Sequence, residues 1–357
     1  MIQHRIAVIP GDGIGRDVIP EGLKAVQEAA LLAGFDLATE FFPWGSEYYI
    51  QTGQMMPADA LDTLASFDAI YLGAVGSPQV PDHVTLWGLL LPIRKGFDLY
   101  VNYRPIQLLQ GVITPLRGKG PADIDFVCIR ENTEGEYSGV GGRVHVGTDQ
   151  EVAMQTAVFT RHGVERVVRY AFELARSRRK RLASITKSNA QQYTSVFWDE
   201  VVRELAQEYP DVQVRHIHVD AATIYFVTEP ETFDVVVGSN LFADILTDLG
   251  GAIQGGLGLA PSANFHPGRK PALFEPTHGS APTIAGQGLA NPIATIWSGS
   301  LMLDWLGEVK GGALIYEAIK KVLREGKVRT PDLGGTATTS EVGDAVVEAM
   351  RSLAGQR

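Results

Sequence analysis

Short runs of apolar and often β-branched residues recur along the chain, with polar or amphipathic stretches between them. They occupy residues 5–10, 68–75, 125–130, 182–186 and 234–239, and several are followed by apolar residues at helical spacing. A strand that is buried on both faces of a largely parallel sheet has this nearly continuous apolar pattern, and helices form the crossovers between such strands. The pattern therefore predicts an α/β protein.

Two further segments have clear local signals. Residues 17–33 have apolar positions at helical spacing, with Pro20 in the expected first turn and Gly34 directly after the last position. Proline is accepted early in a helix and glycine commonly ends one, so we predict the first helix here. The glycine-rich segment 136–143 and the run 152–160 predict two extended segments that need not belong to the main sheet.

Glycines at positions 11, 13 and 15 follow the first predicted strand, where a dinucleotide-binding fingerprint would stand. The third glycine of that fingerprint would fall at position 16, which is Arg16. The usual phosphate-binding turn is therefore not supported. A purely structural turn and a contact with a ligand both remain open.

Asp244 and Asp248 are four residues apart in a helical pattern, so one helix face would carry both carboxylates. Like charges at this spacing repel each other, and Leu241, Ile245 and Leu249 form an apolar stripe next to them. A hard divalent cation such as Mg²⁺ or Mn²⁺ would convert the repulsion into coordination. The alternative is a helix with two solvated acids.

Composition narrows the range of functions. A chain of 357 residues and 38.6 kDa is long enough for two domains or one large α/β unit. The net charge of −10 disfavours nucleic-acid binding, and we expect the single basic run, 176–181, to be a solvated surface. No segment is apolar enough for a membrane span or a signal peptide. The single cysteine, Cys128, fits a reducing compartment such as the cytoplasm and a buried, inert thiol.

Three arginines, one tyrosine and one lysine lie in segments that fit the recognition of a small hydroxy diacid. Guanidinium groups bind carboxylates with two parallel hydrogen bonds and stay charged at any working pH. These residues are Arg94, Arg104, Arg130, Tyr137 and Lys187, and with the acidic pair they form a distinctive set.

With these motifs the chain resembles the β-decarboxylating dehydrogenases, the family of isopropylmalate, isocitrate, homoisocitrate and tartrate/D-malate dehydrogenases. The resemblance runs nearly end to end through IPGDGIG, RENTEGEYSG, TKSN, SNLFADILTDLG, GLAPSAN, FEPTHGSAP and ANPIATIWS. It implies two α/β domains with a large shared mixed sheet, which differs from the ordinary Rossmann fold. Residues 1–98 plus 256–357 would form a large cofactor-binding domain. Residues 99–255 would form a smaller domain with a dimerisation segment and the metal and catalytic residues.

The resemblance also implies roles for individual residues in a homodimer whose subunits share active sites. Arg94, Arg104 and Arg130 would bind the carboxylates of a malate-type substrate. The ligands of Mg²⁺ or Mn²⁺ would be Asp244, Asp248 and Asp220 of the partner subunit. Tyr137 and Lys187 of the partner subunit would be the acid–base pair. Lys187 accepts a proton only in its neutral form, which a nearby cation and desolvation favour.

The resemblance places the adenosine of a nicotinamide cofactor on His278, Gly279, Ser280 and Ala281, with Asn291 at the adenine and Asn189 near the nicotinamide. NAD-dependent relatives usually have an aspartate where this chain has Thr283, and NADP-dependent relatives have Lys-Tyr at that place. Because Thr283-Ile284 offers no group for a 2′-phosphate, we predict NAD. A requirement for a monovalent cation such as K⁺ remains open.

The segment before Arg94 indicates the substrate. Isocitrate dehydrogenases have serine and asparagine where this chain has Gly88 and Leu90, so isocitrate is disfavoured. Isopropylmalate dehydrogenases usually have glutamate in place of Trp87, whose indole would fill the space of an isopropyl group. We therefore predict oxidative decarboxylation of D-malate or tartrate, although residues 191–193 depart from that branch.

Two alternatives remain beside this prediction. If Trp87 only packs in a hinge helix, the chain could be a 3-isopropylmalate dehydrogenase. A non-catalytic regulatory subunit is a remote alternative, because every expected catalytic position is present. The rank order of the three substrates and the choice between dimer and tetramer remain open.

Overall fold

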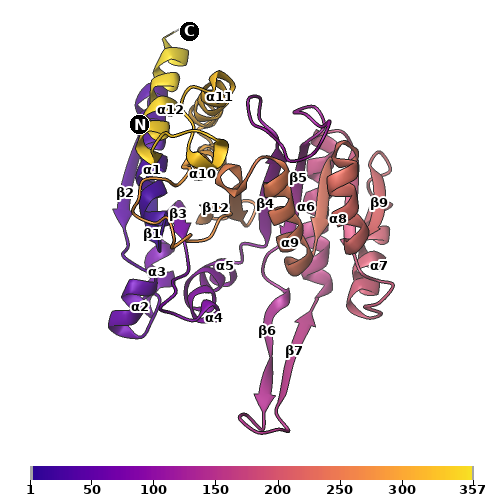
Figure 1. Cartoon of the computed structure of the whole chain (residues 1–357). Coiled ribbons are helices and arrows are strands. Elements are labelled where there is room, and N and C mark those ends of the chain that lie inside the picture. Colours follow the sequence, from indigo (N-terminus) through magenta and orange to yellow (C-terminus); the bar gives the residue numbers. More distant parts are fainter. Residues whose placement is uncertain (1–2, 356–357) are drawn as a thin grey trace. The chain divides into compact units, whose positions relative to one another are not determined.

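The computed structural model describes residues 3–355, and their contacts divide the chain into two units (Figure 1). Unit 1 combines the described residues up to Leu99 with Pro105–Ile124 and the residues from Gly251 onward, and unit 2 combines Tyr100–Arg104 with Asp125–Gly250. The chain thus leaves unit 1 and returns to it. The observed division differs from the predicted domains mainly at 105–124, which we expected in the smaller domain.

Unit 1 has a mixed sheet with the strand order β2-β1-β3-β12-β11. The first four strands run parallel, with Ile6 of β1 opposite Ala69 of β3, and β11 runs antiparallel to β12. Both β3 and β12 are buried along their whole length, as the apolar pattern predicts. The strands are β1 Gln3–Gly11, β2 Asp36–Phe41, β3 Ala69–Ala74, β11 Pro261–Phe265 and β12 Ala272–Pro276.

The helices of unit 1 include four long ones, α1, α10, α11 and α12, which pack against one another (Figure 1). The first helix begins at Gly15, so Pro20 lies inside it and not in its first turn as predicted. It ends as predicted at Gly34, whose φ of 83° suits glycine. The helices are α1 Gly15–Ala33, α2 Ser46–Thr52, α3 Ala60–Leu64, α4 Asp82–Thr85, the π-helical turn Leu86–Leu90, α5 Leu91–Gly96, the 3₁₀ turns Leu257–Leu259 and Pro331–Leu333, α10 Ile293–Trp305, α11 Val309–Glu325 and α12 Thr339–Ala354.

Unit 2 has a parallel core of strands in the order β5-β10-β8-β9. The strands β6 and β7 form a separate two-stranded antiparallel sheet, which confirms the prediction for 136–160 (Figure 1). The strands are β4 Val101–Gln107, which continues into unit 1, β5 Asp125–Glu131, β6 Gly135–Val144, β7 Val152–Val158, β8 Arg181–Thr186, β9 Gln213–His218 and β10 Val235–Gly238. The helices are α6 Arg161–Ser177, α7 Thr194–Ala206, α8 Val219–Thr228, the 3₁₀ turn Pro230–Thr232 and α9 Asn240–Ile253.

The basic run 176–181 is more than the solvated surface that we expected. Arg178 donates its Nε to Asp234 Oδ1 at 2.9 Å, and the backbone N–H of Arg179 donates to Asp234 Oδ2 at 2.8 Å. The Asp234 side chain has no exposed surface. A buried carboxylate needs such partners, so this run anchors the start of β10.

The α/β class with a large mixed sheet, distinct from an all-parallel Rossmann sheet, is confirmed. Within residues 3–355, none of the helices combines the length and the apolar character that a bilayer span requires.

Candidate active site

Asp244 of α9 is the centre of an ion-paired cluster in unit 2. Arg104 of β4 lies 3.3 Å from it, measured from Nη1 to Oδ1, and also donates to Thr247 Oγ1 at 2.6 Å. Arg130 of β5 contacts the same carboxylate oxygen and donates its Nε to Asn240 Oδ1 at 2.9 Å. Both arginines are buried, whereas 34% of the Asp244 side chain is exposed. Two predicted substrate arginines and one predicted metal ligand are therefore neighbours.

Sequence reasoning did not single out the two residues that orient these arginines. Asn240 and Thr247 are both buried and both lie in the same motif as Asp244. Thr247 follows Asp244 by three residues, which places both on one helix face. That spacing was the available signal for Thr247.

Tyr137 of β6 joins the same cluster. Its hydroxyl donates to Asp244 Oδ2 at 3.1 Å, and the guanidinium carbon of Arg130 lies 5.5 Å from the centre of its ring. Burial, and next the charge of Asp244, raise the pKa of Tyr137 above its ordinary value. The phenol is therefore protonated at neutral pH and can donate a proton.

Asp248 lies one turn after Asp244 on α9. Burial first, and then the neighbouring charge of Asp244, raise the pKa of Asp248, while Arg104 and Arg130 act against this shift. The predicted repulsion between the two acids is thus present. Within the described part of the chain, no group of three or more histidine, cysteine, aspartate or glutamate side chains could hold a metal. One chain therefore supplies the acidic pair without a third such ligand.

Lys187 and Asp220 form a pair of their own in unit 2. Lys187 directly follows β8 and donates its Nζ to Asp220 Oδ1, in the first turn of α8, at 2.7 Å. The hydrogen bond from Lys187 lowers the pKa of Asp220. The two groups that we assigned to the partner's side of the site are therefore neighbours within one chain.

Arg94 of α5, in unit 1, is 3% exposed and donates its Nη2 to Glu275 Oε1 of β12 at 2.6 Å. Glu275 also accepts from Asn264 Nδ2 at 2.9 Å. The buried Nε of Arg94 has no hydrogen-bond partner among residues 3–355, so this donor remains for a ligand carboxylate. Glu275 is a positioning residue that sequence reasoning missed, although it belongs to the motif FEPTHGSAP.

The expected adenosine-binding turn at 278–281 rests on the glycine turn after β1. A Cβ at Gly13, which has a φ of +52°, would lie 2.0 Å from the carbonyl oxygen of Ser280. The N–H of Ile14 donates to that oxygen at 2.8 Å. The structure therefore gives Gly13 a structural role, because only a residue without a side chain lets the turn at 278–281 pack this closely. Burial lowers the pKa of His278, and no described residue accepts from or donates to its Nε2.

The remaining expected cofactor residues differ in whether they already form hydrogen bonds within the protein. Asn291 donates to Asp332 Oδ2 at 3.0 Å and accepts from the N–H of Ile293 at the start of α10. Asn189 and Thr283 are exposed. Asn291 thus holds its own loop in place, whereas the other two can be reached from solvent.

Of the expected substrate-pocket residues, only Trp87 is well exposed, at 41%, and Lys95 Nζ lies 4.6 Å from its ring. Leu90 is 9% exposed and packs in the core of unit 1. A Cβ at Gly88 would lie 2.5 Å from Met55 Cγ. The glycine at 88 therefore has a packing reason that is independent of the substrate.

The chain is similar to a known family of dehydrogenases and to several of its members. The sequence profile described as isocitrate/isopropylmalate dehydrogenase matches residues 5–346. The chain is 53% identical over 353 residues to a probable tartrate dehydrogenase/decarboxylase of Agrobacterium vitis, which covers 98% of each protein. It is 55% identical over 357 residues to the decarboxylating D-malate dehydrogenase of Escherichia coli strain K12, covering 97% of this chain and 98% of that protein. The crystal structure of isocitrate dehydrogenase from Methylococcus capsulatus matches with a TM-score of 0.89 and 35% identity, covering 98% of this chain and 99% of that chain.

Proposed function

The chain belongs to the isocitrate/isopropylmalate dehydrogenase family, and we propose that it catalyses the metal-dependent oxidative decarboxylation of D-malate or tartrate with hydride transfer to NAD. Members of this family generally depend on NAD and on a metal ion, and they are typically homodimers. The observation that carries the proposal is the cluster of Arg104, Arg130 and Tyr137 around Asp244. It combines carboxylate recognition with a proton donor and one half of an acidic pair.

The three arginines would bind the carboxylates of the substrate. Arg94 and Arg104 each have a buried Nε without a hydrogen-bond partner among the described residues. Unsatisfied buried donors cost about 1–3 kcal/mol each, which a bound carboxylate would recover. A substrate carboxylate would thus accept the hydrogen bonds that these arginine nitrogens do not form within the protein.

Tyr137 and Lys187 would move the protons. Tyr137 is held protonated beside Asp244, so it can protonate the carbon that loses CO₂. Lys187, which we assign to the partner's side of the site, would remove the hydroxyl proton. Its Nζ donates to Asp220 Oδ1 at 2.7 Å, so the proposed base and the proposed third metal ligand are neighbours.

The acidic residues fit a hard divalent cation. Asp244 and Asp248 offer carboxylate oxygens one helical turn apart, and the raised pKa of Asp248 reflects a repulsion that a cation would relieve. Because one chain provides no third such ligand among residues 3–355, Asp220 of the partner subunit completes the proposed set. When bound, Mg²⁺ or Mn²⁺ would supply Lewis-acid polarisation of the substrate oxygen.

For the cofactor, we propose that the turn 278–281 and Asn291 of one subunit bind the adenosine of NAD, with Asn189 near the nicotinamide. The unpartnered Nε2 of His278 supports a ligand contact at this turn. Thr283 is exposed and offers no cation for a 2′-phosphate, which favours NAD over NADP. Trp87 and Leu90 would line the substrate side and disfavour a large substituent.

A steady-state panel tests this proposal. It compares D-malate, tartrate isomers, 3-isopropylmalate and isocitrate, each with NAD or NADP and with Mn²⁺ or EDTA. We expect the highest kcat/KM with D-malate or tartrate and NAD, and no turnover in EDTA. A preference for 3-isopropylmalate would instead assign Trp87 a packing role. Undiminished turnover after exhaustive chelation would overturn the proposal.

A further inference from the structure

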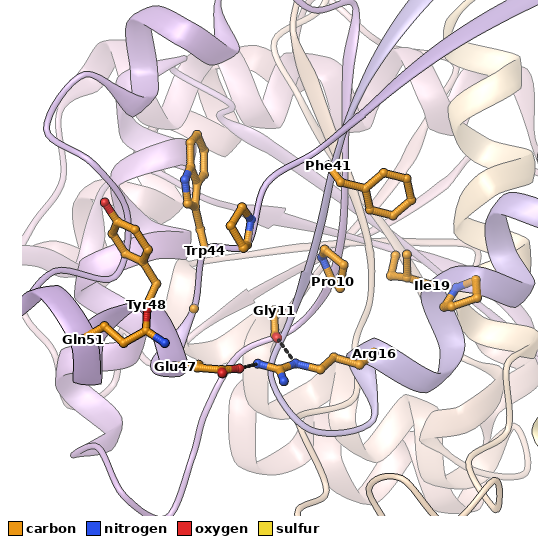
Figure 2. A pocket seen from close by; sticks show the side chains of 12 residues that line it. Pro10, Gly11, Arg16, Ile19, Phe41, Trp44, Glu47, Tyr48 and Gln51 are labelled. Atoms are coloured by element: carbon orange, nitrogen blue, oxygen red, sulfur yellow. Dashed lines mark hydrogen bonds and ion pairs between the residues drawn. The ribbon is translucent and has the colours of Figure 1, made fainter.

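A cavity of about 400 Å³ lies in unit 1 at the carboxyl ends of β1 and β2, outside the residues assigned above. Figure 2 shows the rings of Trp44 and Phe41 at one side of it and the side chains of Arg16 and Glu47 at the other. In open α/β sheets, ligands commonly bind at the carboxyl ends of strands. The volume is within the range of small-molecule sites.

The wall of this cavity is mainly apolar and aromatic. Trp44 is 5% exposed, and its ring centre lies 4.5 Å from that of Phe42 behind it, whereas Phe41 is 58% exposed. Further apolar lining residues are Pro10, Ile19, Pro20, Pro43 and the ring of Tyr48. Such walls favour a flat apolar ring, because aromatic and proline surfaces contact both of its faces.

Two polar groups in the wall of this cavity form no hydrogen bond with the described part of the chain. Neither the indole N–H of Trp44 nor the hydroxyl of Tyr48 has a hydrogen-bond partner among residues 3–355. The indole nitrogen of Trp44 is not among the fully buried groups that lack a partner, so solvent reaches it. A bound ligand can therefore take the place of water at both donors.

Arg16 adds a positive charge, and its only ion-pair partner among the described residues is the exposed Glu47. Its Nη2 donates to Glu47 Oε2 at 2.7 Å and its Nε donates to the Gly11 carbonyl at 3.1 Å (Figure 2). The side chains of Arg16 and Glu47 are 53% and 60% exposed. An ion pair this exposed contributes little to stability, so an anionic ligand can take the place of Glu47 at little cost.

We infer that this cavity binds an aromatic carboxylate, with the ring against Trp44 and Phe41 and the carboxylate on Arg16. The apolar wall would contact the ring, and Arg16 of the exposed ion pair would bind the carboxylate. The indole N–H of Trp44 and the hydroxyl of Tyr48 can donate further hydrogen bonds. The site is independent of the proposed reaction, since none of its residues is assigned to the substrate, the metal or the proton transfers.

The test uses the fluorescent aromatic anion 8-anilinonaphthalene-1-sulfonate on the whole protein, with NAD at saturation so that the cofactor site is filled. Competition by 1-naphthoate measures the carboxylate, and the neutral 1-naphthalenemethanol is its matched control. We expect the probe to bind at one saturable site. 1-Naphthoate should displace it at a concentration at least about tenfold lower than the alcohol requires. A tenfold difference in affinity is what one charge-assisted hydrogen bond to the carboxylate would contribute.

Two substitutions in one ion pair make the test specific. Arg16→Gln should raise the Kd of 1-naphthoate roughly tenfold, whereas Glu47→Gln should lower it, because the competing carboxylate is gone. A general loss of folding would weaken binding in both variants. Arg130→Gln, in the substrate cluster, should leave the Kd unchanged. Absence of saturable binding, equal displacement by the alcohol, or the same direction of change in both variants would overturn the inference.

Discussion

Glutamine in place of Glu275 should destabilise unit 1, because it leaves the charge of Arg94 buried without a counter-ion. Arg94 and Glu275 are 3% and 6% exposed, and their closest nitrogen and oxygen are 2.6 Å apart, so solvent screens this pair little. Two charges about 4 Å apart interact by about 4 kcal/mol at an effective dielectric constant of about 20. Removal of one partner of a buried pair costs about 3–5 kcal/mol. The glutamine oxygen still accepts a hydrogen bond worth about 1 kcal/mol, which leaves a loss of about 3 kcal/mol.

Urea unfolding followed by circular dichroism measures this loss at pH 7. The matched control is Glu317→Gln, because Glu317 pairs with Lys320 on the surface of α11, with side chains 50% and 43% exposed. Its expected effect is below about 0.5 kcal/mol. If Arg94 binds substrate, Glu275→Gln should also raise KM for D-malate more than it lowers kcat. A loss below about 1 kcal/mol together with an unchanged KM would refute the reasoning.

Three further predictions concern the proposed site. Mixing inactive Tyr137→Phe and Lys187→Met subunits should restore about a quarter of wild-type activity, because about half of the dimers are mixed and each mixed dimer has one intact shared site of two. If no activity returns, Tyr137 and Lys187 of one site come from the same subunit. Asp248→Asn should abolish metal-dependent turnover. It should also stabilise the metal-free protein by about 0.2–0.5 kcal/mol in urea unfolding, since the repulsion between two like charges at this spacing disappears. A less stable metal-free variant would contradict the repulsion between Asp244 and Asp248. Gly13→Ala should raise KM for NAD at least about tenfold, because its Cβ would lie 2.0 Å from the Ser280 carbonyl oxygen, and an unchanged KM would show that the turn does not bind NAD.

The elements that sequence predicted best are those whose signal is local. Buried strands such as Ala69–Ala74 show their apolar pattern directly, and Gly34 marks the end of α1 through its left-handed backbone. Segment 105–124 was harder, because its place depends on distant residues. Thr114 Oγ1 donates to the Ile253 carbonyl at 2.6 Å, and the Gln107 N–H donates to Gln254 Oε1 at 2.8 Å. Such contacts leave no periodic pattern in the segment itself.

The sequence by itself determined which chemical groups this protein has: arginines for carboxylates, an acidic pair on one helix face, and glycines that permit a tight turn. Only the tertiary structure decided what each group contacts. Arg104 meets Asp244 across 140 positions, and Arg94 meets Glu275 across 181. The reason is physical: charge and helical spacing are properties of neighbouring residues, whereas an ion pair depends on which strand ends and helices the folded chain brings within a few ångströms.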